Sequence, residues 1–175
     1  MAETPVLDHI LFTEEQLAAR VAQLGRQISA DYRGKTPLFV GILRGSILFF
    51  ADLLKQISID CTIDFMCLSS YSGTESSGQV RTMLDLRESI KGRDVIIVED
   101  IVDTGITMHN VLPLFANKGA ASVKIACLLQ KPDKLQVDLK VDYCALEIPN
   151  DFIVGYGLDY DGFGRNYKDI YTLAK

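Results

Sequence analysis

The sequence predicts a single α/β domain with a mostly parallel central sheet that is covered by helices on both faces. Strand-like apolar runs alternate with helical stretches along the chain, which is typical of parallel sheets. The 175 residues fall in the usual size range of one domain, and 48% hydrophobic with 23% charged residues is typical of a folded protein. No repeat, low-complexity tract or composition break divides the chain, so residues 1–175 are expected to form one unit.

The first helix is predicted to begin after Thr13, which forms a capping-box pattern with Gln16. Apolar residues follow at helical spacing, and Gly34 ends the pattern. The run 38–43 comes next and is expected to be a buried strand. Ser46 is a candidate cap for a second helix that runs toward Ile57.

Residues 62–68 are rich in strand-forming residues, and extended structure is expected to resume at 83–86. The segment 69–80 between them is polar and rich in Ser and Gly. Loops of that length are uncommon inside compact domains and often close over a site, although a plain surface loop is the alternative. A strand at 95–98, a helix that ends near Gly119, and strands at 123–129 and 143–148 complete the pattern.

The charge balance argues against two classes of partner. Lys and Arg number 18 against 23 Asp and Glu, a net charge of −5, whereas nucleic-acid and anionic-membrane binders need a basic surface. No run approaches the roughly 20 apolar residues of a membrane span. The acidic N-terminal region lacks a signal-peptide pattern, so a cytoplasmic protein with four reduced, buried cysteines is expected.

The segment 95–107 carries the strongest chemical signal. An apolar strand is predicted to end in Glu99 and Asp100, and Asp103 is followed by Thr-Gly-x-Thr and a helix. Ligands of parallel sheets bind beyond the carboxyl ends of strands, and a helix N-terminus favours a phosphate group. Carboxylates accept hydrogen bonds from hydroxyls, so the pattern indicates a ligand with both phosphate and sugar. The alternative is that the first two acids are solvated strand-end charges and that Asp103 caps the helix.

Residues Glu99–Thr107 resemble the phosphoribosyl-diphosphate-binding motif of type I phosphoribosyltransferases. Other segments resemble those of the hypoxanthine–guanine phosphoribosyltransferase family and occur in its order: 43–46, 49–53, 70–71, 128–131, 151–160 and Arg165. The resemblance covers roughly residues 8 to 172. It implies the type I phosphoribosyltransferase fold, with a core over about 30–150 and a small hood from the N-terminal residues and about 151–175.

The resemblance implies that Asp103 is the catalytic base and that Mg²⁺ is the cofactor. The implied ligands of Mg²⁺ are Glu99, Asp100 and Asp159. The implied contacts to phosphoribosyl diphosphate are Arg44, Gly45, Glu99, Asp100, Asp103, Thr104, Gly105, Ile106, Thr107 and Arg165. Some family members carry lysine where this chain has Ile106, so only a backbone contact is expected there. A surface ion pair between Asp159 and Arg165 is the alternative for those two residues.

The implied purine contacts are Lys131, Phe152, Ile153 and Asp159, and the implied closing flap includes Ser70 and Tyr71. An ammonium only donates hydrogen bonds, so Lys131 suits a 6-oxopurine and mismatches adenine. Without the resemblance, Lys131 reads as a surface charge and 152–154 as a core strand.

The expected activity is transfer of 5-phosphoribosyl from phosphoribosyl diphosphate to hypoxanthine and guanine, in a homodimer or homotetramer. Two alternatives stay open: an enzyme of the same fold that acts on xanthine or a pyrimidine, and a regulator that senses the donor without catalysis. No helix-turn-helix pattern or basic stripe supports the regulator.

Overall fold

The computed structural model describes residues 4–70 and 80–174. Its larger sheet has six strands in the order β4-β3-β2-β5-β6-β7, and all neighbours are parallel except β3 and β4. The strands are β2 (Leu38–Leu43), β3 (Thr62–Ser70), β4 (Val80–Leu84), β5 (Asp94–Val102), β6 (Ser122–Gln130) and β7 (Tyr143–Glu147). This confirms the predicted α/β fold with a mostly parallel sheet.

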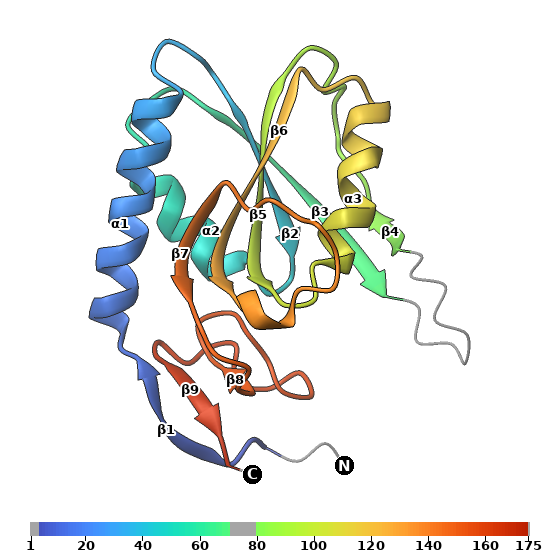
Figure 1. Cartoon of the computed structure of the whole chain (residues 1–175). Helices are drawn as coiled ribbons and strands as arrows, with labels where there is room; N and C mark the ends of the chain where they lie inside the picture. Colours follow the sequence, from blue (N-terminus) through green and yellow to red (C-terminus); the bar gives the residue numbers. More distant parts are fainter. Residues whose placement is uncertain (1–3, 71–79, 175) are drawn as a thin grey trace.

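Helices cover both faces of this sheet. One face packs against α1 (Glu14–Asp31) and α2 (Ile47–Lys55), and the other packs against α3 (Ile106–Asn117) (Figure 1). The capping box of Thr13 and Gln16 is present at the start of α1, as predicted. A short 3₁₀ helix, η1 (Pro132–Lys134), follows β6.

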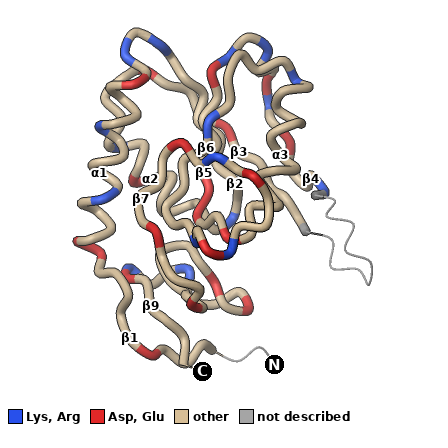
Figure 2. Tube along the Cα trace, viewed as in Figure 1, with Lys and Arg blue, Asp and Glu red and all other residues tan. Residues whose placement is uncertain are grey.

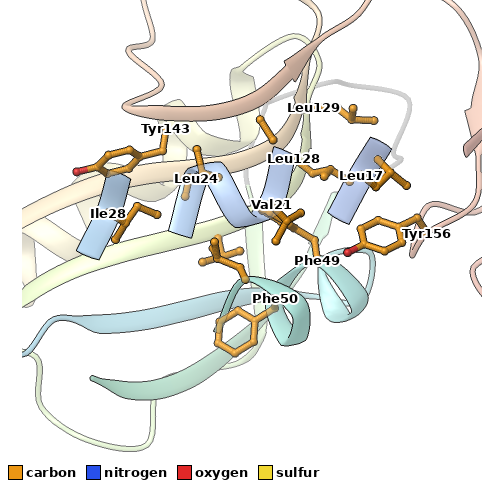
Figure 3. Packing of buried hydrophobic residues seen from close by; sticks show 14 of the residues in the cluster. Leu17, Val21, Leu24, Ile28, Phe49, Phe50, Leu128, Leu129, Tyr143 and Tyr156 are labelled. Carbon is orange, nitrogen blue, oxygen red and sulfur yellow. The ribbon is translucent and has the colours of Figure 1, made fainter. Parts of the chain in front are cut away.

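The core on the α1 side joins the two helices to the sheet. Apolar side chains from one face of α1 meet α2 and strand β6, and Phe49 is fully buried among them (Figure 3). Burial of a large aromatic side chain stabilises a fold by a few kcal/mol. The residues that α1 contributes are the ones that its helical spacing predicts: Leu17, Val21, Leu24 and Ile28.

A second, three-stranded antiparallel sheet lies beyond the carboxyl ends of the central strands (Figure 1). It joins β1 (Leu7–Phe12) near the N-terminus to β8 (Ile153–Val154) and β9 (Ile170–Leu173), in the order β1-β9-β8. The two ends of the chain therefore meet in one small sheet that faces the edge where the predicted site lies.

Three local predictions are wrong. The strand predicted at 95–98 continues through Val102, because β5 keeps its parallel pairing with β6 to that residue, so Glu99 and Asp100 lie within the strand. The Ser46 hydroxyl does not cap α2 but donates to the Ile42 carbonyl at 2.6 Å, because the Ser46 backbone is already helical. All four cysteines are free, but only Cys127 is buried.

The predicted loop at 69–80 is shorter than expected at both ends. Ser69 and Ser70 belong to β3, and Val80 begins β4, which ends at Leu84. Tyr71 and the rest of the predicted flap lie outside the described residues. No helix in the described part of the chain is long and apolar enough to cross a membrane.

Candidate active site

The candidate site lies at the carboxyl ends of the two central strands, β2 and β5. The chain leaves β2 through α2 to reach β3 on one side, and leaves β5 through α3 to reach β6 on the other. The crossovers therefore diverge between β2 and β5, which is the position where open α/β sheets bind their ligands. A cavity of about 360 Å³ lies at this point.

Nine of the predicted site residues line this cavity, and they come from segments far apart in the sequence. They are Gly45, Glu99, Asp100, Asp103, Thr104, Gly105, Thr107, Asp159 and Arg165. The other predicted residues whose side chains the structure describes lie outside its lining: Arg44, Ile106, Lys131, Phe152 and Ile153. The fold thus brings most of the predicted donor contacts together in one cavity. Of the predicted purine contacts, Asp159 lines this cavity, whereas Lys131, Phe152 and Ile153 lie outside its lining.

The turn 103–107 forms a cradle at the start of α3. Gly105 is the N-cap residue in the left-handed region (φ 81°), and no side chain caps the helix. A helix start without a side-chain cap presents amide N–H groups that suit an anion. The alternative that Asp103 caps the helix is therefore wrong. The Thr104 hydroxyl accepts from the Ile106 N–H at 3.4 Å within the same turn.

The floor of the cavity is acidic. Glu99 is buried, and burial together with the nearby Asp100 charge raises the pKa of the Glu99 carboxyl well above its ordinary value. Asp100 accepts the Ile101 N–H at 2.8 Å and packs against Gly45. The residue before that glycine, Arg44, is exposed and joined to Leu43 by a cis peptide bond. Both acids are therefore fixed parts of the cavity rather than solvated strand ends.

The two carboxylate oxygens of Asp103 have different surroundings. Oδ2 accepts from the Lys134 ammonium at 3.0 Å. Oδ1 is buried and has no hydrogen-bond partner among the described residues. An unpaired buried acceptor is costly, so Oδ1 is suited to accept a proton or a hydrogen bond from a ligand.

The ion pair considered for Asp159 and Arg165 is present, with a distance of 2.7 Å between the two side chains. Asp159 also accepts the Gly162 N–H at 2.8 Å, and Arg165 donates to the Gly157 carbonyl at 2.6 Å. Because both side chains line the cavity, the pair belongs to the site and not to a remote surface. It brings one carboxylate and one guanidinium opposite the acids of β5.

Lys131 contacts the segment that carries Phe152, just before β8. Lys131 is buried, so the surface-charge alternative is wrong, and its ammonium donates to the Asp151 carbonyl at 2.8 Å. Burial lowers the pKa of Lys131. Phe152 leaves 78% of its area exposed, whereas Val154 is fully buried. The core-strand alternative therefore holds for Val154 and not for the phenyl ring, and Ile153 pairs with Thr172 in the small sheet.

Comparison with known proteins agrees with this geometry. A family model described as a phosphoribosyl transferase domain matches residues 10–161. A hypoxanthine-guanine phosphoribosyltransferase from Streptococcus agalactiae is 47% identical over 162 residues, which cover 92% of this chain and 88% of the relative. The same-named protein of Streptococcus thermophilus is also 47% identical, with 95% and 93% covered. This chain belongs to the hypoxanthine-guanine phosphoribosyltransferase family.

Solved structures of the family support the same assignment. A hypoxanthine phosphoribosyltransferase from Staphylococcus aureus superposes with a TM-score of 0.92 at 43% identity, covering 96% of this chain and 92% of that one. A hypoxanthine-guanine phosphoribosyltransferase from Bacillus anthracis gives a TM-score of 0.92 at 39% identity, with 96% and 99% covered. The chain is thus a purine phosphoribosyltransferase with the type I fold.

Sequence reasoning missed Lys134, the partner of Asp103. It lies three residues after Lys131 in a polar stretch that has no motif of its own. Acidic and basic residues are scattered over the described chain, so one lysine among them gives no signal (Figure 2). The contact spans 31 positions in the sequence and exists only because η1 folds back onto the turn after β5.

Proposed function

We propose that this enzyme transfers the 5-phosphoribosyl group of phosphoribosyl diphosphate to hypoxanthine and guanine, giving IMP or GMP and pyrophosphate. The observation that carries the proposal is the Asp103 carboxylate. Its Oδ1 is buried, has no hydrogen-bond partner within residues 4–70 and 80–174, and lies beside a helix start that can hold a phosphate. The names of the relatives support the same pair of purines.

The donor would lie across the cavity. Amides and hydroxyls of residues 104–107 would hold its 5′-phosphate, Ile106 through its backbone alone. Glu99 and Asp100 would orient the ribose, because their carboxyl groups lie on the floor of the cavity beside the cradle. Arg165 and the backbone at Arg44 and Gly45 would hold the pyrophosphate, which a planar guanidinium binds with paired hydrogen bonds.

The reaction needs one proton to leave the purine. One imidazole nitrogen attacks the anomeric carbon of the ribose, the bond from that carbon to pyrophosphate breaks, and the pyrophosphate keeps the electron pair. The other ring nitrogen loses its proton to Asp103 Oδ1 as this happens. A positioned carboxylate typically contributes about 10²- to 10⁴-fold to such a step.

Purine selection would come from the second group of residues. Lys131 would donate to the 6-oxo group, Phe152 would stack on the ring, and Ile153 would meet the base edge through its backbone, near Asp159. The ammonium of Lys131 already points its proton at a carbonyl, that of Asp151, so a purine oxygen is a suitable replacement. A 6-amino group would face a donor with a donor, which disfavours adenine.

Mg²⁺ would be held by the acids that line the cavity, Glu99, Asp100 and Asp159, together with donor oxygens and water. Among the described residues no three His, Cys, Asp or Glu side chains form a ready metal cluster. This fits Mg²⁺, which often binds one or two carboxylates and completes its shell with substrate and water. When bound, the ion would neutralise charge on the pyrophosphate.

The proposal also covers the assembly, the cellular setting and the roles of two further segments. We propose a homodimer or homotetramer in a reducing, cytoplasmic setting, in which the four free cysteines stay reduced. The hood role of the β1-β9-β8 sheet and the flap role of Ser70 and Tyr71 also stay predictions.

The test is pyrophosphate release from donor and Mg²⁺ with each of four purines. We expect turnover with hypoxanthine and guanine and less than about one hundredth of that kcat/KM with adenine. Preference for xanthine would establish the same-fold alternative. Donor binding by calorimetry without turnover on any base would establish the sensing alternative.

A further inference from the structure

Three contacts in succession join the turn after β5 to the segment after β6. The Lys131 N–H donates to the Val102 carbonyl at 3.0 Å, and the Gln136 N–H donates to the Thr104 carbonyl at 2.9 Å. Between these two backbone bonds, the Lys134 ammonium donates to Asp103 Oδ2 at 3.0 Å. Val102, Asp103 and Thr104 are thus bonded to Lys131, Lys134 and Gln136, respectively.

The local fold of η1 sets the position of the Lys134 side chain. Pro132 occupies the first turn, and the Lys134 N–H donates to the Lys131 carbonyl at 3.1 Å, which closes that turn. The side chains of Lys134 and Asp103 are 34% and 39% exposed, so the ion pair is partly shielded from water. A partly buried pair restrains its members more than a fully exposed one.

We infer that Lys134 is a positioning residue for Asp103, an inference that rests on the proposed function. A lone carboxylate rotates about two side-chain bonds and exchanges its two oxygens. With Oδ2 held by the Lys134 ammonium, Oδ1 is the oxygen that stays without a partner and takes the purine proton.

The same turn connects Lys131, the proposed purine contact, with Asp103, the carboxylate that takes the proton. Lys131 precedes the turn that Lys134 ends; Lys134 contacts Asp103, and Lys131 is the proposed purine contact. Movement of this turn would displace Lys131 and Asp103 together. Lys134 is therefore expected to affect kcat, with little effect on donor binding.

The experiment measures kcat and both KM values for Lys134→Met, Lys134→Arg and the matched control Lys118→Met. Lys118 makes an ion pair of similar length, 2.9 Å, with Asp85 in a more exposed setting. We expect Lys134→Met to lower kcat about 10- to 100-fold, which is the size of loss that displacement of a catalytic group by about 1 Å can cause. The KM for the donor should stay within threefold of the wild-type value. Lys134→Arg should recover most of kcat, and the control should match the wild type.

A double variant separates positioning from a general structural role. In the Asp103→Asn background, Lys134→Met should change kcat less than twofold, because no base is left to position. Thermal unfolding of each variant checks folding, and Lys134→Gln replaces Lys134→Met if the latter unfolds. Unchanged kcat in Lys134→Met would overturn the inference. A rise in donor KM at constant kcat would also overturn it, because Lys134 would then be a phosphate contact. An equal loss of kcat in the wild-type and Asp103→Asn backgrounds would overturn it as well. Absence of wild-type turnover would instead contradict the proposed function.

Discussion

Replacing Gly45 with alanine should damage the site through Asp100. Gly45 is buried two residues after the end of β2, and its φ lies outside the left-handed region, so the backbone itself accepts an alanine. A Cβ atom at this position would lie 1.7 Å from Asp100 Oδ2 and 2.6 Å from Cγ. Real Cβ contacts shorter than 3.0 Å essentially never occur, so the carboxylate would have to move by about 1.3 Å or more.

Neither Asp100 nor Gly45 can move away from this contact easily, because each is held by a neighbour. The Asp100 carboxylate is held by the Ile101 N–H at 2.8 Å. Gly45 is held from the other side, because a Cβ on Gly157 would lie 2.1 Å from the Gly45 carbonyl oxygen. We expect overpacking to cost about 1–3 kcal/mol of unfolding free energy. A displacement of about 1 Å in a positioning acid should lower kcat/KM for the donor about 100-fold, or about 2.7 kcal/mol.

The assay combines denaturant unfolding with steady-state kinetics. Gly34→Ala is the matched control: its φ of 78° is strained for alanine, but nothing lies within 4 Å of the added Cβ, so it should lose stability and keep activity. Asp100→Ala in the Gly45→Ala background should recover the lost stability and not the activity. Neutral surface substitutions change the free energy of unfolding by up to about 0.5 kcal/mol. If Gly45→Ala stays within that limit and keeps kcat/KM for the donor within threefold, Gly45 and Asp100 are not in the tight contact described.

Four other predictions concern Asp103, the two purine contacts Lys131 and Phe152, and the core. Asp103→Asn should lower kcat about 10²- to 10⁴-fold while calorimetry shows nearly unchanged donor affinity; near-normal kcat would remove Asp103 from the mechanism. Because burial lowers the pKa of Lys131, its ammonium should lose its proton at a lower pH than ordinary lysine, so KM for hypoxanthine should rise with alkaline pH. Lys131→Arg should show no such rise; an equal rise in both would assign it to another group. Phe152→Ala should raise purine KM by roughly 5- to 150-fold, the equivalent of about 1–3 kcal/mol, with little loss of stability. Phe49→Ala should instead lower the free energy of unfolding in urea by about 3–5 kcal/mol, because Phe49 is fully buried. A similar loss of stability in Phe49→Ala and Phe152→Ala would contradict the difference in burial of the two rings.

Local patterns in the sequence were enough to predict most of the fold. The capping box of Thr13 and Gln16 and the apolar spacing that follows are short-range signals, and α1 forms where they indicate. The alternation of apolar runs and helical stretches predicted the parallel sheet, since neighbouring parallel strands need a crossover. The length of β5 was underestimated, because Glu99 and Asp100 interrupt its apolar run, while pairing with β6 continues through Val102.

The candidate donor residues were predicted because many of them lie in one continuous segment, 99–107, whose types and order suit phosphate and sugar. The sequence also indicated Lys131 and Phe152, through the resemblance to the family. It did not indicate how the two differ: the lysine is buried against the Asp151 carbonyl, and the phenylalanine is exposed. Burial depends on which segments cover a side chain, and a linear pattern does not specify that.

Composition, periodicity and the 99–107 segment determined by themselves the class of fold and the class of ligand. Only the tertiary structure decided which oxygen of Asp103 is free, that Lys134 holds the other, and that Asp159 and Arg165 face the acids of β5. The physical reason is distance along the chain. Local preferences act over a few residues, whereas these contacts form when packing brings separate loops to one edge of the sheet.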